Sequence, residues 1–318
     1  MEDILIESIE SYGLSKKDKP NVLFSKVGII GCGTVGQNIA STISRKGIEV
    51  VFIEQTENFV AKAMIGIERE LNAQIEHWGM TESEKKIVLS KIKGYTDYDC
   101  LSGCDLVIET VFTKTSELVV NIRKGILKNI EKHVSPDTII ATNSATLVIT
   151  ELSSELEYKH RCVSMHFTTN VPDAKIVEVV KGLYTSDIVY ENACKFIRMI
   201  GKMVIPVEES PGLISVRMFI PIINEACEML MEGIATKENI DLTMKNGLGM
   251  PLGPFEIADR VGLDKLQRWM DNLYSEFGDL KYKASPLIKH LVRANHLGRK
   301  TNKGFYDYDE DGKKIIKK

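Results

Sequence analysis

The sequence predicts an α/β protein in two parts: a mostly parallel sheet covered by helices, followed by an all-helical second domain. Short apolar runs alternate with segments of helical periodicity up to about residue 208, and no convincing strand follows until the end. A Pro-Gly pair at 211–212 separates the two regions. The chain has 318 residues, of which 43% are hydrophobic and 27% are charged. This composition is typical of a globular protein with about two domains.

The first part consists of predicted strands separated by helices, so we expect parallel strands joined by right-handed crossovers. Residues 26–31 form a short buried-strand run that ends in glycine, and residues 48–54 form a run that ends in a carboxylate. Apolar residues four apart, as at Val35, Ile39 and Ile43, indicate helices between them. The expected strands are 26–31, 48–54, 105–110 and 137–142, and the expected helices are 34–46, 56–78 and 114–132.

After residue 161 the pattern changes to two strands joined by a short turn at Pro172. Residues 213–231 are almost wholly apolar and predict a buried helix, which Pro221 can kink. The remaining expected elements are strands 161–167, 174–180 and 203–207 and helices 186–200, 237–246, 262–277 and 285–295. The predicted division is an N-terminal arm at 1–25, a sheet domain at 26–208 and a helical domain at 209–318.

Charge and cysteine content exclude several classes of protein. Lys plus Arg total 41 and Asp plus Glu total 44, so the formal net charge is −3 and no basic field for nucleic acid or an anionic membrane is expected. No apolar run approaches the roughly 18 residues of a membrane span, and the start has no signal-peptide pattern. The 6 cysteines are too scattered for a disulfide scaffold or a metal site. We therefore expect reduced thiols in the cytoplasm.

A GxGxxG motif at Gly31, Gly33 and Gly36 lies between the first strand and the first helix. In this context the first glycine permits a tight turn, the second lets a diphosphate approach the backbone, and the third lets the helix pack on the strand. Glu54 ends the next strand, where a carboxylate accepts from both ribose hydroxyls and repels a 2′-phosphate. The motif predicts a Rossmann-type domain that prefers NAD to NADP. The alternative is a glycine-rich turn beside a solvated glutamate.

His166 and Glu178 lie in the two strands of the predicted hairpin, at equal distances from Pro172. In an antiparallel pair they would face each other on one side of the sheet. A carboxylate beside an imidazole orients the ring and raises its proton affinity, which makes a general base for a hydroxyl whose carbon loses a hydride. The alternative interpretation is a core histidine whose hydrogen bonds are satisfied.

Several segments, in order, resemble the L-3-hydroxyacyl-CoA dehydrogenases, and most closely the short bacterial 3-hydroxybutyryl-CoA dehydrogenases. They are GCGTVG, DLVIET, ATNSAT, MHFTTNVPDAKIVEVVKG, ESPGLISVR, PLGPFEIADRVGLD and LGRKTNKGFYDY, within about residues 26–308. The resemblance implies a Rossmann NAD-binding domain, an all-helical substrate and dimerisation domain, a cleft between them and a homodimer. It also implies reversible NAD-dependent oxidation of the 3-hydroxyl of an acyl-CoA, with His166 as the base and Glu178 as its partner.

The resemblance extends the set of candidate site residues. The residues expected to bind NAD are Gly31, Gly33, Thr34, Val35, Gly36, Glu54, Glu109 and Asn143. The residues expected to contact the substrate are Ser144, Thr146 and Thr169.

The chain departs from the family at positions close to the chemistry. Ala145 stands where the family has a serine that contacts the substrate hydroxyl. Thr169 replaces an asparagine near the histidine, and Val216 replaces an asparagine near the reacting carbonyl. Loss of such a donor typically lowers the rate about 10²- to 10³-fold.

Further departures concern the binding of cofactor and substrate. Thr113 and Leu118 stand where the family has a Glu and a Lys near the nicotinamide. The helix from residue 56, usually basic and in contact with the CoA phosphates, offers Lys62 and Arg69. A less basic helix binds a phosphate less strongly.

Three hypotheses follow from the sequence. The first is an NAD-dependent dehydrogenase of a short 3-hydroxyacyl-CoA. The second is the same hydride transfer on a different hydroxy compound, such as an acyl-carrier-protein thioester or a free hydroxy acid. The third is a protein that binds NAD or a CoA ester without turnover.

Overall fold

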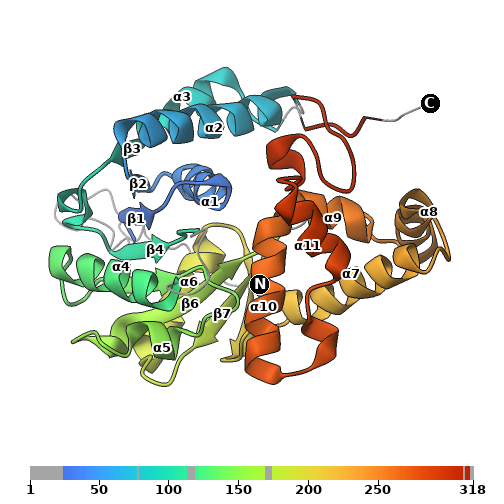
Figure 1. Ribbon diagram of the computed structural model, residues 1–318. Helices are drawn as coiled ribbons and strands as arrows, with labels where there is room; N and C mark the ends of the chain where they lie inside the picture. The colour runs from blue at the N-terminus through green and yellow to red at the C-terminus, as the bar shows by residue number, and fades with distance from the viewer. Residues whose placement is uncertain (1–23, 77–78, 113–118, 169–173, 311, 316–318) are drawn as a thin grey trace, which may run out of the picture.

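The computed structural model describes residues 24–76, 79–112, 119–168, 174–310 and 312–315, which form a sheet domain beside a helical domain (Figure 1). The sheet has the order β3-β2-β1-β4-β5-β6-β7-β8. Neighbouring strands pair in parallel, except that β6 and β7 pair antiparallel. The strands are β1 (Lys26–Ile30), β2 (Glu49–Ile53), β3 (Ile92–Tyr95), β4 (Leu106–Glu109), β5 (Ile139–Thr142), β6 (Cys162–Phe167), β7 (Ile176–Lys181) and β8 (Met203–Glu208).

Helices cover both faces of this sheet. Alternate residues of β2 show the division, because Val50 and Phe52 belong to one hydrophobic core and Val51 and Ile53 to another. Residues of α1, α2 and α6 fill the first core, and residues of α4 and α5 fill the second. The helices are α1 (Thr34–Ser44), α2 (Glu57–Glu76), α3 (Glu82–Ser90), α4 (Val119–His133), α5 (Ile149–Ser153) and α6 (Asp187–Met199).

The helical domain follows β8 and completes the expected fold class. Its helices are α7 (Ser215–Met231), α8 (Lys237–Leu242), α9 (Pro254–Val261), α10 (Leu263–Phe277) and α11 (Pro286–Arg293). The predicted apolar helix corresponds to α7, which contains Pro221 and buries Ile220 and Ile223. An α/β sheet followed by an all-helical domain confirms the predicted fold class. Among the described residues, no helix combines the length and the apolarity that a membrane crossing requires.

Some elements differ from the sequence prediction. Strand β3 and helices α3, α5 and α9 were not expected, because each is short, with 4, 9, 5 and 8 residues respectively. In addition, β3 and α3 each bury a single residue, Ile92 and Val88. The last two residues of the predicted arm at 1–25 are among the described residues. Phe24 is 2% exposed in the sheet domain's core, with its ring centroid 4.9 Å from that of Phe196. The rest of the arm, residues 1–23, lies outside the described residues.

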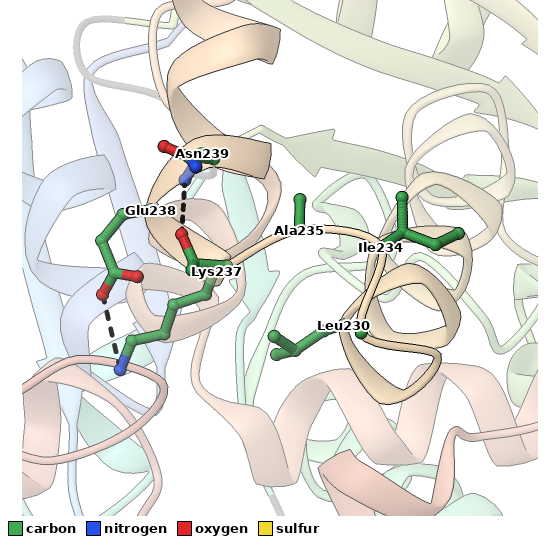
Figure 2. A pocket seen from close by; sticks show the side chains of 8 residues that line it. Leu230, Ile234, Ala235, Lys237, Glu238 and Asn239 are labelled. Carbon is green, nitrogen blue, oxygen red and sulfur yellow. Dashed lines mark hydrogen bonds and ion pairs between the residues drawn. The ribbon is translucent and has the colours of Figure 1, made fainter.

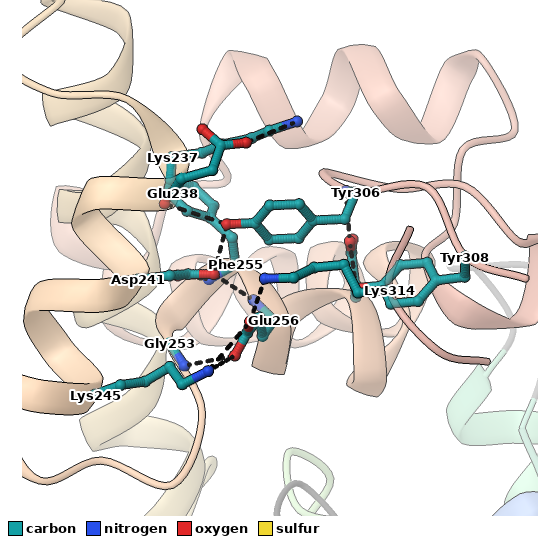
Figure 3. A network of polar contacts seen from close by, with 11 residues as sticks. Lys237, Glu238, Asp241, Lys245, Gly253, Phe255, Glu256, Tyr306, Tyr308 and Lys314 are labelled. Carbon is teal, nitrogen blue, oxygen red and sulfur yellow. Dashed lines mark hydrogen bonds and ion pairs between the residues drawn. The ribbon is translucent and has the colours of Figure 1, made fainter. Parts of the chain in front are cut away.

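The segment after α11 contributes Phe305, Tyr306 and Tyr308 to the core of the helical domain. Figure 3 shows polar contacts between this segment and the helices. The Tyr306 hydroxyl donates to Asp241 at 2.9 Å, and Lys314 pairs with Glu256. The Asp259 carboxylate accepts from the backbone N–H groups of Phe305 and Tyr306 and from the Tyr308 hydroxyl, each at 2.9 Å. Burial nevertheless raises the pKa of Asp259 to about 6. The segment is therefore bound to α8 and α9 through buried carboxylates.

Candidate active site

The glycine-rich loop joins β1 to α1 at the carboxyl edge of the parallel strands. Gly31 has φ +85°, a conformation that other residues rarely adopt. A Cβ at Gly36 would lie 2.4 Å from the Gly31 carbonyl oxygen, so only glycine lets α1 approach the strand this closely. A Cβ at Gly33 would have no neighbour within 4 Å. The loop thus presents Gly33 to open space at the first turn of α1, where Thr34 and Val35 follow.

Glu54 follows β2 and lies beside this loop. Its Oε1 accepts from the backbone N–H of Cys32 at 2.6 Å, which places the carboxylate next to the open position at Gly33. A helix N-terminus with free N–H groups suits a diphosphate, and an adjacent carboxylate suits ribose hydroxyls. The residues present therefore fit a dinucleotide without a 2′-phosphate.

Glu109 ends β4 and is fully buried. Its carboxylate accepts from Arg123 of α4 at 2.9 Å, from the Thr142 hydroxyl at 2.8 Å and from the backbone N–H of Val111 at 2.7 Å. Arg123 also donates to the Val111 carbonyl oxygen at 2.7 Å. Val111 in turn lies against the glycine-rich loop, because a Cβ at Gly31 would be 3.1 Å from Val111 Cα. The geometry makes Glu109 a residue that shapes the loop after β4.

His166 and Glu178 face each other across the antiparallel pair β6–β7, in the register that their positions around Pro172 predict. His166 Nδ1 lies 2.7 Å from Glu178 Oε2, and the two residues are 4% and 1% exposed. An ionised carboxylate can only accept, so Nδ1 carries a hydrogen, and in the neutral form of the ring Nε2 has the free lone pair. Glu178 therefore holds the His166 ring in an orientation in which Nε2 can act as a base.

The Glu178 carboxylate receives further hydrogen bonds from the start of α7. The backbone N–H groups of Ile214 and Ser215 donate to Oε1 at 3.0 and 2.9 Å, and the Ser215 hydroxyl donates to Oε2 at 2.8 Å. Burial raises the pKa of Glu178, but the hydrogen bonds from His166 and Ser215 outweigh burial and bring the pKa below its ordinary value. Glu178 is therefore ionised at neutral pH.

The loop after β5 contains three of the expected site residues. Asn143 Oδ1 accepts from the backbone N–H of Phe167 at 2.8 Å, next to His166. Ser144 Oγ accepts from Leu147 N at 3.0 Å. Thr146 Oγ1 accepts from Asn272 of α10 at 2.9 Å. Thr169, the remaining expected substrate contact, lies outside the described residues, as do Thr113 and Leu118.

Two of the family departures lie in the protein interior. Ala145 is 6% exposed and Val216 is fully buried, and both belong to the hydrophobic core of the helical domain. The Ala145 carbonyl oxygen accepts from Gly212 N at 2.7 Å, which ties the loop to the start of the helical domain. A small cavity of about 10 Å³ adjoins Ala145, Ser144 and Ser164. Apolar packing here replaces the polar side chains that the resemblance led us to expect.

Sequence reasoning did not identify Arg123, Ser215 or Asn272. Arg123 and Asn272 lie on helices whose pattern indicates only amphipathic packing, so no local signal marks them. Ser215 is one residue before Val216, in the segment that the resemblance covers. The one signal in the sequence was therefore that Ser215 is polar and stands next to Val216, the position at which the family has an asparagine.

Comparison with known proteins places this site in a family. The family model "3-hydroxyacyl-CoA dehydrogenase, NAD binding domain" matches residues 26–210, and "3-hydroxyacyl-CoA dehydrogenase, C-terminal domain" matches residues 212–308. The chain is 38% identical over 285 residues to a 3-hydroxybutyryl-CoA dehydrogenase of Clostridioides difficile, covering 90% of this chain and 100% of that protein.

Solved structures agree with these matches. The (S)-3-hydroxybutyryl-CoA dehydrogenase PaaH1 of Ralstonia eutropha is 37% identical with a TM-score of 0.78, covering 90% of this chain and 100% of that chain. FadB2 of M. tuberculosis is 29% identical with a TM-score of 0.84, covering 90% of this chain and 99% of that chain.

Proposed function

The chain belongs to the 3-hydroxyacyl-CoA dehydrogenase family, and we propose that it oxidises the 3-hydroxyl of short 3-hydroxyacyl-CoA thioesters such as 3-hydroxybutyryl-CoA, with His166 as the base. The observation that carries this proposal is the buried contact of 2.7 Å between His166 Nδ1 and Glu178. NAD is the cofactor, because the matched N-terminal family model is an NAD-binding domain. The names of the similar dehydrogenases favour a CoA thioester over a free hydroxy acid.

The proposed chemistry follows from the orientation of His166. Nε2 takes the proton of the substrate hydroxyl while that carbon becomes a carbonyl, and Glu178 stabilises the resulting imidazolium. NAD, when held by the glycine-rich loop and Glu54, would supply the acceptor for the hydride that leaves the same carbon. Burial of the pair excludes water from the ion pair and strengthens it. In the reverse direction the imidazolium returns the proton to the developing alkoxide.

We assign supporting roles to the other candidate residues. Gly31, Gly33, Thr34, Val35 and Gly36 bind the diphosphate of NAD, and Glu54 accepts from its ribose hydroxyls. Glu109 acts through its contacts with Arg123 and Thr142, which fix the loop beside the nucleotide. Asn143 lies next to the end of β6 and holds the nicotinamide side. Ser144, Thr146 and Thr169 contact the substrate.

We further propose a homodimer formed through the helical domain, in the cytoplasm. Large apolar side chains are exposed on this domain; among them are Met218 (67%), Ile234 (61%), Leu242 (54%) and Leu248 (70%). An open hollow of about 650 Å³ lies between the end of α7 and the start of α8, lined in part by Leu230 and Ile234 (Figure 2). We infer that these exposed apolar side chains lie in the interface between the two copies. All 6 cysteines are free, which suits a reducing compartment.

The test measures oxidation of NADH with acetoacetyl-CoA by the wild type and by His166→Ala. We expect wild-type turnover and a loss of about 10²- to 10⁴-fold in the variant, the usual contribution of a general base. NADH fluorescence titration of both proteins is the control and is expected to give equal affinities. Turnover unaffected by the substitution would refute the role of His166. Reduction only of 3-oxoacyl thioesters of acyl carrier protein, or only of free 3-oxo acids, would refute the substrate class.

A further inference from the structure

Glu178 is bound by groups from both domains. The imidazole of His166 comes from the sheet, whereas the Ser215 hydroxyl and the N–H groups of Ile214 and Ser215 come from α7. Each carboxylate oxygen accepts two of these four donors, which matches its two lone pairs. Nδ1 of His166 and Oγ of Ser215 converge on the same oxygen, Oε2, at 2.7 and 2.8 Å.

We propose that Ser215 is a positioning residue whose hydroxyl fixes the Glu178 carboxylate against His166 and limits how strongly Glu178 raises the proton affinity of that imidazole. This role deepens the proposed function and rests on it, because the proton affinity of His166 affects turnover only if His166 is the base. Ser215 does not touch the reacting atoms in this scheme.

The proposal follows from the sharing of one oxygen by two donors. A hydroxyl that donates to Oε2 withdraws part of the negative charge that would otherwise act on the imidazolium. Without it, the carboxylate attracts the proton on His166 more strongly, and that proton becomes harder to remove. A base works best when its pKa lies near the operating pH, so a rise would leave more of the enzyme protonated and inactive at neutral pH.

The surroundings of the pair give Ser215 this influence. Apart from burial, the groups that most strongly affect the pKa of Glu178 are His166 of β6 and Ser215 of α7, and both lower it. Val216, the next residue, is fully buried and has no side-chain donor. Of the side chains in the helical domain, the Ser215 hydroxyl is the one whose described contacts reach the His166–Glu178 pair. The position of α7 is thereby coupled to the basicity of His166.

The experiment compares the pH dependence of kcat/KM for 3-hydroxybutyryl-CoA oxidation in the wild type, Ser215→Ala and Ser215→Thr. Ser215→Ala is expected to shift the acid limb upward by about half a pH unit, a fraction of one hydrogen bond to a charged group. Ser215→Thr keeps a hydroxyl and is expected to restore the wild-type limb. Ser285→Ala is the control: Ser285, like Ser215, carries a hydroxyl at the start of a helix in this domain, but Ser285 is buried and its hydroxyl contacts Leu287 N.

An unchanged or downward acid limb in a folded Ser215→Ala variant would overturn the proposal. If that variant does not fold, Ser215→Cys is used, because a thiol is a weak donor of similar shape and predicts a smaller upward shift. NMR titration of the His166 ring, assigned with His166→Gln, measures the same pKa without turnover. An upward NMR shift without any turnover would mean that the positioning is right and the proposed function wrong. If turnover depends on His166 but Ser215→Ala shifts neither the acid limb nor the NMR titration, the proposed function is right and the role of Ser215 is wrong.

Discussion

Asn272 and Thr146 join the two domains by a hydrogen bond: Nδ2 of Asn272, on α10, donates to Oγ1 of Thr146, on the loop after β5, at 2.9 Å. The same loop is bound to the start of the helical domain through the Ala145 carbonyl oxygen and Gly212 N. The loop that carries the expected substrate contacts therefore takes its position from the helical domain.

Asn272→Ala is expected to lower kcat/KM about fivefold with little change in NADH affinity. One hydrogen bond contributes about 1 kcal/mol, which corresponds to this factor. Steady-state kinetics and NADH titration measure the two effects. Gln267→Ala, an amide on the same helix whose described contact is Asp271, is the control and is expected to match the wild type. A similar loss in both variants would argue against a specific role for the Thr146 contact.

Alanine at two glycines of the nucleotide loop is expected to separate binding from folding. A Cβ at Gly33 meets no atom within 4 Å, so Gly33→Ala keeps the free energy of unfolding within about 1 kcal/mol of the wild type while it weakens NADH binding. A Cβ at Gly36 meets the Gly31 carbonyl oxygen at 2.4 Å, so Gly36→Ala loses stability and binding together. Urea unfolding and NADH fluorescence measure both quantities. Unchanged NADH affinity in Gly33→Ala would contradict a diphosphate at this position.

Glu109→Ala is expected to destabilise the protein by about 3 kcal/mol or more, because it leaves the Arg123 cation buried without its partner. Arg123 and Glu109 side chains are 13% and 0% exposed. Glu155→Ala is the control. Glu155 is exposed and pairs with Lys124 and Lys128 of the same helix α4, and its removal is expected to change the free energy of unfolding little. Denaturant unfolding measures both. Full stability with lost NADH affinity would instead indicate a direct contact between Glu109 and the nucleotide.

The free energy of unfolding is expected to depend on pH through Lys265. Burial, with Arg123 and Lys300 nearby, lowers the pKa of Lys265 to about 8 from 10.5. Between these pH values the unfolded chain binds the proton more tightly than the folded protein, so this group makes the folded state more stable as pH rises. Lys265→Met is expected to be more stable than the wild type at pH 7, by at most about 3 kcal/mol.

This difference between Lys265→Met and the wild type is expected to shrink as pH rises from about 8 to 10.5, because the wild-type lysine then becomes neutral. Denaturant unfolding across this range measures it. A difference that does not vary with pH would mean that the loss of charge is not its cause.

The sequence pattern predicted the elements that repeat a clear apolar spacing. The GxGxxG context and the terminal carboxylate at Glu54 were sufficient to place the loop, the first helix and the second strand. The equal distance of His166 and Glu178 from Pro172 predicted their register, because pairing in a hairpin is symmetric about its turn. The roles of these residues remain proposals.

The contacts that position these residues could not be predicted in the same way. Asn272 lies 126 positions from Thr146, and nothing near either residue reveals the other. The described structure buries Ala145 and Val216 in a core that belongs to the helical domain, whereas their positions in sequence suggested only missing polar groups. These contacts depend on how the two domains pack against each other, and the periodicity of a single segment does not predict that packing.

The buried carboxylate of Asp259 has a consequence for the order in which the protein forms during synthesis. Its partners Phe305, Tyr306 and Tyr308 follow every helix of the helical domain in the chain. The ribosome therefore completes the sheet domain, and every helix of the second domain, before those partners exist. Until then Asp259 needs water or a proton, because a lone buried carboxylate is costly. The helical domain therefore cannot complete its core until residues 305–308 have been synthesised.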